Sequence, residues 1–215
     1  MQLSCKKGVG FVCVPKCGSS TIEVIMRPHS DFQMSNNPKL KHIKFSEVEE
    51  FVFPLLSKMR IKKPYMFAIV REPISWVKSW YQYRAREELS PANHPQHRNY
   101  TGHLNFHEFV ECCMLEKPPS FARIHSQSSF VLARDGSVGV DKLIPIDQID
   151  TKLQNFLLRY NIQIPNKIVA KNQSKPRDTE PLPVELEQRL RTHLSSDFEL
   201  YEKFSRDDIN NKKEQ

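Results

Sequence analysis

Three short runs of apolar residues, at 10–14, 65–70 and 142–146, punctuate the chain. The first two runs show no alternation of polar and apolar positions, which is typical of strands that are buried on both faces. Apolar residues at helical spacing occupy much of the sequence between and after these runs. Strands that alternate with helices in this way predict an α/β fold with a central parallel sheet.

The helix boundaries are predicted from local signals. Ser20 and Glu23 have the spacing of a capping box at the start of one helix, and Pro28 ends that helix early. Pro73 stands where the first turn of another helix is expected. The further helices that we expect, the first of them interrupted by Pro54, cover 46–58, 73–84, 151–160 and 183–204.

The length of 215 residues suits one α/β domain with a sizeable core. We expect this domain to cover 1–205 and to be followed by a polar tail at 206–215 that frays. The region 87–107 is polar and rich in histidine, and it interrupts the α/β pattern. Insertions of this length are more often functional than simple connectors, so we predict a ligand-binding insertion over 84–130.

The segment 11–21 is predicted to form a strand, a tight loop and the start of a helix. Such a junction directs backbone N–H groups and the positive end of the helix at one place, which favours an anion. The loop is not a Walker A motif, because Lys16 precedes Gly18 instead of following the second glycine. The candidate phosphate-binding residues of this loop are Lys16, Cys17, Gly18, Ser19, Ser20 and Thr21.

The segment 67–81 repeats this arrangement at the end of a second strand. Arg71 follows the apolar run, Pro73 starts a helix, and Ser79 lies two turns further along. An arginine at the carboxyl end of a parallel strand can bind a phosphate with its forked guanidinium, and ligands of open parallel sheets bind at that edge. Trp76 and Trp80 are four residues apart on the same helix, and we expect at least one of them to pack in the core.

Together the two corners resemble the phosphate-binding motifs of sulfotransferases that use 3′-phosphoadenosine 5′-phosphosulfate (PAPS), in particular the carbohydrate-modifying, Golgi-type and bacterial members. The loop at Lys16 resembles the 5′-phosphosulfate loop, and Arg71 with Ser79 resembles the 3′-phosphate motif. The resemblance implies a P-loop nucleotide-kinase-like fold, a three-layer sandwich around the sheet. It also implies PAPS as the donor, 3′-phosphoadenosine 5′-phosphate (PAP) as the product, a hydroxyl-bearing carbohydrate or small-molecule acceptor, and no metal.

Transfer of a sulfuryl group needs a base that takes the proton of the acceptor hydroxyl, and a histidine suits this role near neutral pH. Of the eight histidines we favour His42, which lies between the two phosphate motifs. A catalytic histidine stands there in some members of the family, whereas others use a glutamate. The neighbouring lysines are expected to lower the pKa of His42, and Lys16 is expected to stabilise the leaving phosphate.

Two further segments carry weaker signals. Asn172 and Ser174 precede the last helix and resemble the Asn-x-Ser segment of the carbohydrate-modifying sulfotransferases, which implies a contact with the nucleotide. His103 and His107 have the i, i+4 spacing of metal ligands, but nothing nearby completes a known pattern, so we predict no metal site. Alternatively, polar and basic residues of the insertion bind an acceptor that is anionic or rich in hydroxyl groups: Arg84, Arg86, His94, His97 and Arg98.

The composition limits the partners and the compartment. The net charge of +7 suits an anion, but the basic residues are dispersed, so we expect no nucleic acid partner. The longest apolar run is far shorter than the roughly 18 residues of a membrane span. Five cysteines without a regular spacing indicate reduced thiols. We therefore expect a cytoplasmic protein if the chain is complete, and a luminal one if it is an excised domain.

Two other classes of function remain open from the sequence. A P-loop kinase acting on a small molecule would need a GxxxxGK[ST] loop, which is absent from the sequence. A protein that binds phosphate or nucleic acid without catalysis would cluster its basic residues on one face beside aromatic side chains. The sulfotransferase prediction accounts for more of the residues than either alternative.

Overall fold

The computed structural model describes residues 1–164 and 179–210, with side chains up to 204. The contacts divide the chain into two compact units. The unit that we call the sheet unit contains Met1–Arg71, 127–164 and 200–210 of these residues. The other, which we call the helical unit, contains Glu72–Ser126 and 179–199.

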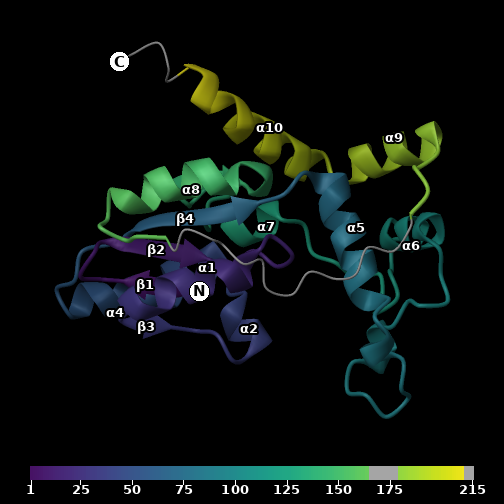
Figure 1. Ribbon diagram of the computed structural model, residues 1–215, viewed down its shortest axis with the longest axis horizontal. Coiled ribbons are helices and arrows are strands. Elements are labelled where there is room, and N and C mark those ends of the chain that lie inside the picture. The colour runs from purple at the N-terminus through teal and green to yellow at the C-terminus, as the bar shows by residue number, and fades with distance from the viewer. Residues whose placement is uncertain (165–178, 211–215) are drawn as a thin grey trace. The chain divides into compact units, whose positions relative to one another are not determined.

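The sheet unit is built on five strands in the order β3-β1-β2-β4-β5 (Figure 1). Strands β2, β4 and β5 are parallel to one another, with Phe11 opposite Phe67. Strand β1 runs antiparallel to both β2 and β3. The bounds are β1 Gln2–Ser4, β2 Val9–Val12, β3 Phe32–Gln33, β4 Tyr65–Val70 and β5 Lys142–Pro145.

The prediction of a parallel sheet is therefore right for the three apolar runs, which form β2, β4 and β5, and wrong for the sheet as a whole. Strand β1 is joined to β2 by a tight turn in which Gly8 takes a left-handed φ of 70°. A connection this short can only link antiparallel neighbours. Strands β1 and β3 have three and two residues, so their sequences carry too little pattern to be recognised.

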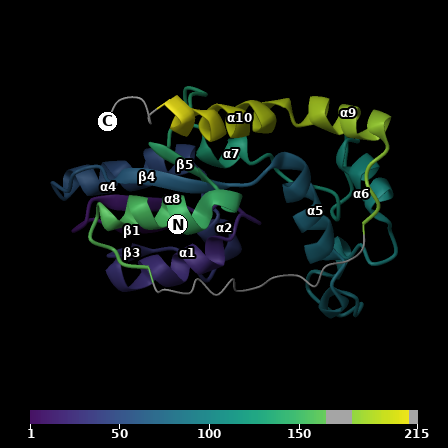
Figure 2. The ribbon, with the colours of Figure 1, turned by 45° about the horizontal axis from the view of Figure 1, so that its top comes forward.

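One face of the sheet is covered by α1 (Ser19–Met26) and α8 (Ile149–Leu158). Phe156 of α8 stacks on Phe67 of β4, with 5.0 Å between the ring centroids. Phe11 lies beside Phe67 on this face, and Gln2, its partner in β1, points the same way. The Nε2 atom of Gln2 donates there to the carbonyl of Glu23 in α1. Figure 2 shows α8 lying along the strands.

Gly10 leaves room for two neighbouring side chains on the opposite face of β2. A Cβ there would lie 2.5 Å from Leu3 Cδ2 and 2.5 Å from Met66 Sδ, the side chains of the two neighbouring strands. The connection that leads to β4 contains several short helices. Pro54 stands in the first turn of the last one, α4. These helices are α2 Pro38–Lys41, α3 Phe45–Glu47, a π-helical turn Val48–Val52 and α4 Phe53–Lys58.

The helical unit contains α5 (Pro73–Arg84), α6 (Phe106–Cys113) and α9 (Val184–His193). Pro73 stands in the first turn of α5, as predicted, and Glu72 caps this helix by accepting hydrogen bonds from the backbone of the first turn. The predicted helix 183–204 is divided at Leu194 into α9 and α10 (Ser195–Asn210). The chain returns to the sheet unit after Ser126, and a short helix, α7 (Ser128–Val131), follows there.

Arg84 has a structural role within the helical unit. Its side chain is buried, and its guanidinium donates to the carbonyls of Ser120, Phe121 and Arg123. It also lies 4.8 Å from the centroid of the Trp80 ring. These donors are committed to the protein itself, so the interpretation of Arg84 as a contact for the acceptor is not supported.

One of the two tryptophans of α5 is a core residue, as expected. Trp76 is fully buried, and its ring meets Trp80 edge to face with 6.1 Å between centroids. An edge-to-face pair of this kind is a common packing arrangement for large aromatic side chains. The two rings thus pack against each other along α5, and Trp80 is partly exposed.

Candidate functional site

The first predicted corner lies in the sheet unit, where β2 ends and α1 begins. Between them Lys16 and Gly18 take left-handed φ angles of 66° and 69°. This region is strained for a residue with a side chain and natural for glycine, so the loop holds Lys16 in an uncommon backbone conformation. Helix α1 has no side-chain cap, and the N–H groups at its start suit an anion.

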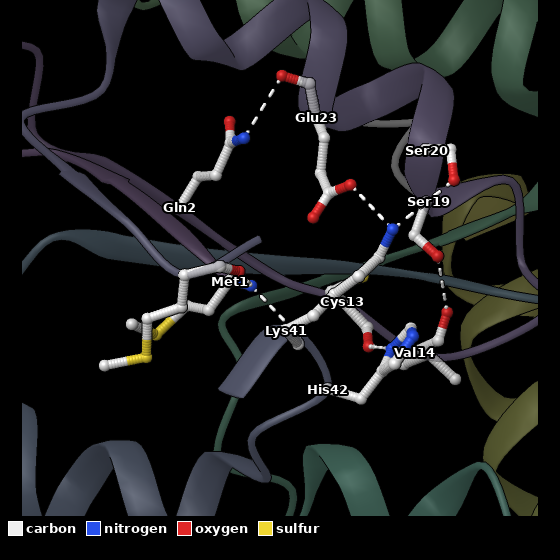
Figure 3. A network of polar contacts seen from close by, with 10 residues as sticks. Met1, Gln2, Cys13, Val14, Ser19, Ser20, Glu23, Lys41 and His42 are labelled. Atoms are coloured by element: carbon white, nitrogen blue, oxygen red, sulfur yellow. Dashed lines mark hydrogen bonds and ion pairs between the residues drawn. The ribbon is translucent and has the colours of Figure 1, made fainter. Parts of the chain in front are cut away.

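The predicted capping box at the start of α1 is wrong. The helix begins at Ser19 with Gly18 as its cap residue, and Ser20 does not cap it. Instead, the Glu23 carboxylate forms an ion pair with Lys41 of α2, with 2.7 Å between Oε2 and Nζ (Figure 3). The sequence pattern was misleading because the helix begins before Ser20, which puts Glu23 beyond the third helical position that a capping box requires.

The side chains of the loop divide into two groups. Ser19 is buried and its hydroxyl donates to the Val14 carbonyl at 2.9 Å, so it stabilises the loop. Cys17 is buried and its thiol donates to Gln127 at 3.2 Å. Lys16, Gly18 and Ser20 are partly or fully exposed, so their surface is accessible to a ligand.

Lys41 connects α2 to the start of α1. Besides its ion pair with Glu23, its Nζ lies 3.4 Å from Ser20 Oγ (Figure 3). Glu23 is only 4% exposed, so both the charge of Glu23 and its partner are largely removed from water. Removing one member of such a pair leaves a buried charge without compensation, which is strongly destabilising. The pair therefore fastens the segment that carries His42 to the first corner.

His42 follows α2 and is half-buried against β2. Its Nδ1 lies 2.7 Å from the carbonyl oxygen of Cys13 (Figure 3). A carbonyl oxygen can only accept, so Nδ1 carries the hydrogen, and in the neutral ring the lone pair is on Nε2. This tautomer is the one that a general base needs if Nε2 faces the substrate.

The environment of His42 lowers its pKa below the usual value. The largest cause is burial, which penalises the charged ring, and the Lys41 ammonium acts in the same direction. The hydrogen bond to Cys13 opposes them without reversing the result. His42 is therefore neutral, and able to accept a proton, at neutral pH. The sequence pointed to the lysines as the cause, whereas burial comes first.

The second corner begins where β4 ends, and Gln127 holds its backbone. The N–H group of Arg71 donates to Gln127 Oε1 at 2.9 Å, and Gln127 Nε2 donates to the Arg71 carbonyl at 2.8 Å. The same Oε1 accepts the hydrogen bond from Cys17. One buried amide thus contacts both predicted corners. Gln127 was not predicted, because nothing in its local sequence distinguishes it.

The remaining predicted site residues lie elsewhere. Ser79 is on α5 in the helical unit, six residues after Pro73, and is partly exposed. Asn172 and Ser174 lie outside the described residues. Within the sheet unit, the structure brings together the Lys16 loop, His42 and Arg71 around β2 and the end of β4.

The histidines of the predicted insertion are dispersed. His97 Nδ1 lies 3.2 Å from the Leu89 carbonyl, and His107 Nε2 lies 3.0 Å from the Pro181 carbonyl. His103 precedes α6, so it does not share a helix with His107 as the spacing suggested. Among the residues that the structure describes, no group of three His, Cys, Asp or Glu side chains is placed to hold a metal ion.

A cavity of about 570 Å³ in the sheet unit is lined by none of the predicted site residues. It lies among the turn after β1, the end of α1 and the end of α8, and its walls include Lys6, Asp31 and Arg159. The Asp31 carboxylate accepts from the backbone N–H groups of Cys5 and Lys6, so its charge is used within the protein. The geometry of the phosphate corners is independent of this cavity.

Comparison with known proteins finds no matching family model, no similar curated protein and no similar solved structure. In the part of the chain that is described, no helix is both long and apolar enough to cross a membrane. The residues of the two corners and His42 are therefore the basis for inferring a function.

Proposed function

We propose that the chain is a sulfotransferase that transfers a sulfuryl group from PAPS to a hydroxyl group of a carbohydrate or a small molecule. The observation that supports this most directly is the shared contact of the two corners with Gln127, which puts Arg71 and the Lys16 loop at one edge of adjacent parallel strands. Ligands of open parallel sheets bind at this edge. A P-loop nucleotide-kinase-like arrangement of three layers is part of the same proposal.

The residues of the first corner suit the 5′ end of the donor. Lys16 supplies a full positive charge, and the uncapped start of α1 supplies N–H groups. Gly18, between Lys16 and the start of α1, is exposed and has no side chain to cover its backbone. Arg71, which is partly exposed, suits the 3′-phosphate, to which its guanidinium can donate two hydrogen bonds. By resemblance, Ser79 is the second ligand of that phosphate.

In the proposed reaction the acceptor oxygen forms a bond to sulfur, while the bond between sulfur and the phosphate oxygen of the donor breaks. His42 Nε2 takes the proton that the hydroxyl loses. Lys16 and the N–H groups of α1 stabilise the negative charge that remains on the phosphate oxygen. The products are a sulfate ester, PAP and a protonated His42, which returns its proton to water.

The acceptor is proposed to bind at the insertion 84–130. Of the basic residues predicted there, Arg98 and His97 are exposed and can meet a ligand with hydroxyl or anionic groups. Replacing 87–107 with an unrelated loop of equal length should change the preference among acceptors. An unchanged preference would remove the insertion from the proposal and leave the donor site in place.

The donor site is tested by calorimetric titration with PAP in the absence of Mg²⁺. The wild type should bind PAP in the micromolar range or tighter. Lys16→Ala and Arg71→Ala should each weaken binding by about 10-fold to 100-fold, the value of a charge-assisted hydrogen bond. Lys62→Ala removes an exposed lysine of the sheet unit and should leave the affinity unchanged. A preference for ATP with Mg²⁺, or for an oligonucleotide, would overturn the proposal.

A further inference from the structure

The most extensively bonded side chain between the two corners is Gln127, which is 1% exposed. It is the residue before α7, and its side chain is directed away from that helix to the end of β4. The amide oxygen accepts from both Arg71 and Cys17, and the amide nitrogen donates to Arg71. Burying an amide is costly unless its donor and acceptor are used, and here both are.

The two bonds to Arg71 continue the sheet by one residue. Strand β5 pairs with β4 as far as Val70, which lies opposite Pro145. At the next residue the partner of the β4 backbone is no longer a strand but the Gln127 amide, which bonds both the N–H group and the carbonyl of Arg71. The backbone of Arg71 is thereby fixed where its side chain leaves the sheet.

The bond from Cys17 adds the first corner to the same support. Cys17 lies directly between Lys16 and Gly18, the two residues with left-handed φ, so its side chain anchors the middle of the loop. Movement of the loop relative to Arg71 must therefore break or bend a bond to Gln127. Pairing of β2 with β4 brings the two strand ends together, and the Gln127 amide extends this connection to the corners themselves.

We propose that Gln127 is a positioning residue that sets the spacing of the two corners, so that the site favours an adenosine nucleotide with phosphate at both its 3′ and 5′ ends over one with a single phosphate. This inference rests on the proposed function. A ligand that contacts two fixed sites gains affinity because the second contact is intramolecular once the first has formed. That gain requires a site whose spacing is set before binding.

Only an amide can make this set of bonds, because one end must accept and the other must donate. Gln127→Met keeps the length and burial of the side chain but removes the hydrogen bonds. Gln127→Glu keeps the acceptor, loses the donor and brings a negative charge to an anion site. Cys17→Ala removes the bond to the loop and leaves the bonds to Arg71 intact.

The test measures the affinity of each protein for PAP, 5′-AMP and 3′-AMP by calorimetry. For the wild type we expect PAP to bind more tightly than either mononucleotide. Gln127→Met should lose about 10-fold in PAP affinity, as expected for loss of the bonds that preorganise the site, while each mononucleotide stays within about 3-fold. Cys17→Ala should show the same selective loss at a smaller size, about 3-fold. Gln188→Met, at an exposed glutamine of α9, is the matched control and should change nothing.

The outcomes separate the two proposals. If Gln127→Met weakens all three ligands equally, or leaves PAP binding unchanged, Gln127 does not set the spacing and the inference is overturned. If Gln127→Met does not fold, as judged by circular dichroism, Cys17→Ala decides: a selective loss of PAP affinity supports the inference, and an equal or absent loss overturns it. If the wild type binds PAP no better than the mononucleotides, the proposed donor site itself is wrong.

Discussion

The histidines of the two units differ in how they are held. In the sheet unit, His42 is half-buried, its Nδ1 is bonded to the backbone of Cys13 directly after β2, and the adjacent Lys41 is fixed by a buried ion pair. In the helical unit, His97 and His103 are exposed, and the contacts of His97 are to a neighbouring loop. A histidine becomes a plausible base when its ring orientation and its protonation are both set by the fold, and this condition is met at His42.

The same contrast holds for ion pairs. The pair of Glu23 and Lys41 has side chains that are 6% and 19% exposed, whereas Glu187 and Arg191 on α9 are 37% and 48% exposed. Water screens the exposed pair and solvates each of its charges when they separate, so this pair contributes little to stability. The charges of the buried pair are largely shielded from water, so each depends on the other. The ion pair beside His42 is therefore expected to contribute more to stability than the pair on α9.

The largest expected effect tests the contrast between the histidines directly. His42→Asn should lower turnover by about 10²-fold to 10⁴-fold, because the proton of the acceptor loses its base. Affinity for PAP should stay within about 2-fold, since His42 is not proposed to bind the nucleotide. The measurement is transfer of labelled sulfate from PAPS to a panel of acceptors, with His193→Asn, at an exposed histidine of α9, as the control. Full activity of His42→Asn would place the base elsewhere.

The next effect tests the contrast between the ion pairs. Glu23→Ala should lower the free energy of unfolding by about 3 kcal/mol or more, because the Lys41 ammonium is left buried without its partner. Glu187→Ala, which breaks the exposed pair of α9, should cost less than about 0.5 kcal/mol. Urea unfolding measures both. In the double variant Glu23→Ala/Lys41→Met, the loss should be smaller than the sum of the losses in Glu23→Ala and Lys41→Met; additive losses would mean that the two groups do not interact.

The third prediction concerns pH. Because the pKa of His42 is lowered, the neutral ring persists on the acidic side of the usual histidine pKa, and the acid limb of kcat/KM should lie there. As pH falls below the usual histidine pKa, His42 takes up a proton in the unfolded chain before it does so in the folded protein. This difference favours the unfolded chain, so the protein becomes less stable as pH falls. Activity profiles and NMR titration of the ring measure the first effect, and urea unfolding at several pH values measures the second.

Lys41→Met sharpens this pH prediction. Removing the ammonium takes away a charge that lowers the pKa of His42, and it leaves the Glu23 carboxylate, which favours the protonated ring. The acid limb and the NMR titration should both move to higher pH. Lys39→Met, at an exposed lysine on the same short helix, is the matched control. An unchanged titration in Lys41→Met would show that this ammonium does not act on His42.

The smallest effect is expected in the helical unit. His103→Ala should change the free energy of unfolding by less than about 0.5 kcal/mol, because the side chain is exposed and its ring contact is at the edge of Phe121. Turnover should also stay near the wild-type value. A large loss of activity in this variant would make His103 itself part of the site and would remove the contrast with His42.

The main part of the fold was accessible from the sequence because it depends on local patterns. The apolar runs identified β2, β4 and β5, and Pro73 marked the start of α5. Parallel strands followed by loops place their carboxyl ends at one edge, so the proximity of the Lys16 loop and Arg71 could also be inferred. The antiparallel strands β1 and β3 were missed, because strands this short have no periodicity to detect.

The contacts that support the candidate site were accessible only from the tertiary structure. Gln127 is 56 residues from Arg71 and 110 residues from Cys17 along the chain, and Lys41 meets Glu23 across a loop and a strand. The amide and the carboxylate could each satisfy their hydrogen bonds in many ways. Which partner each one takes is decided by how the elements pack, because burial removes water as the alternative partner. The sequence by itself thus determined which residues stand at the strand ends, and packing decided what holds them there.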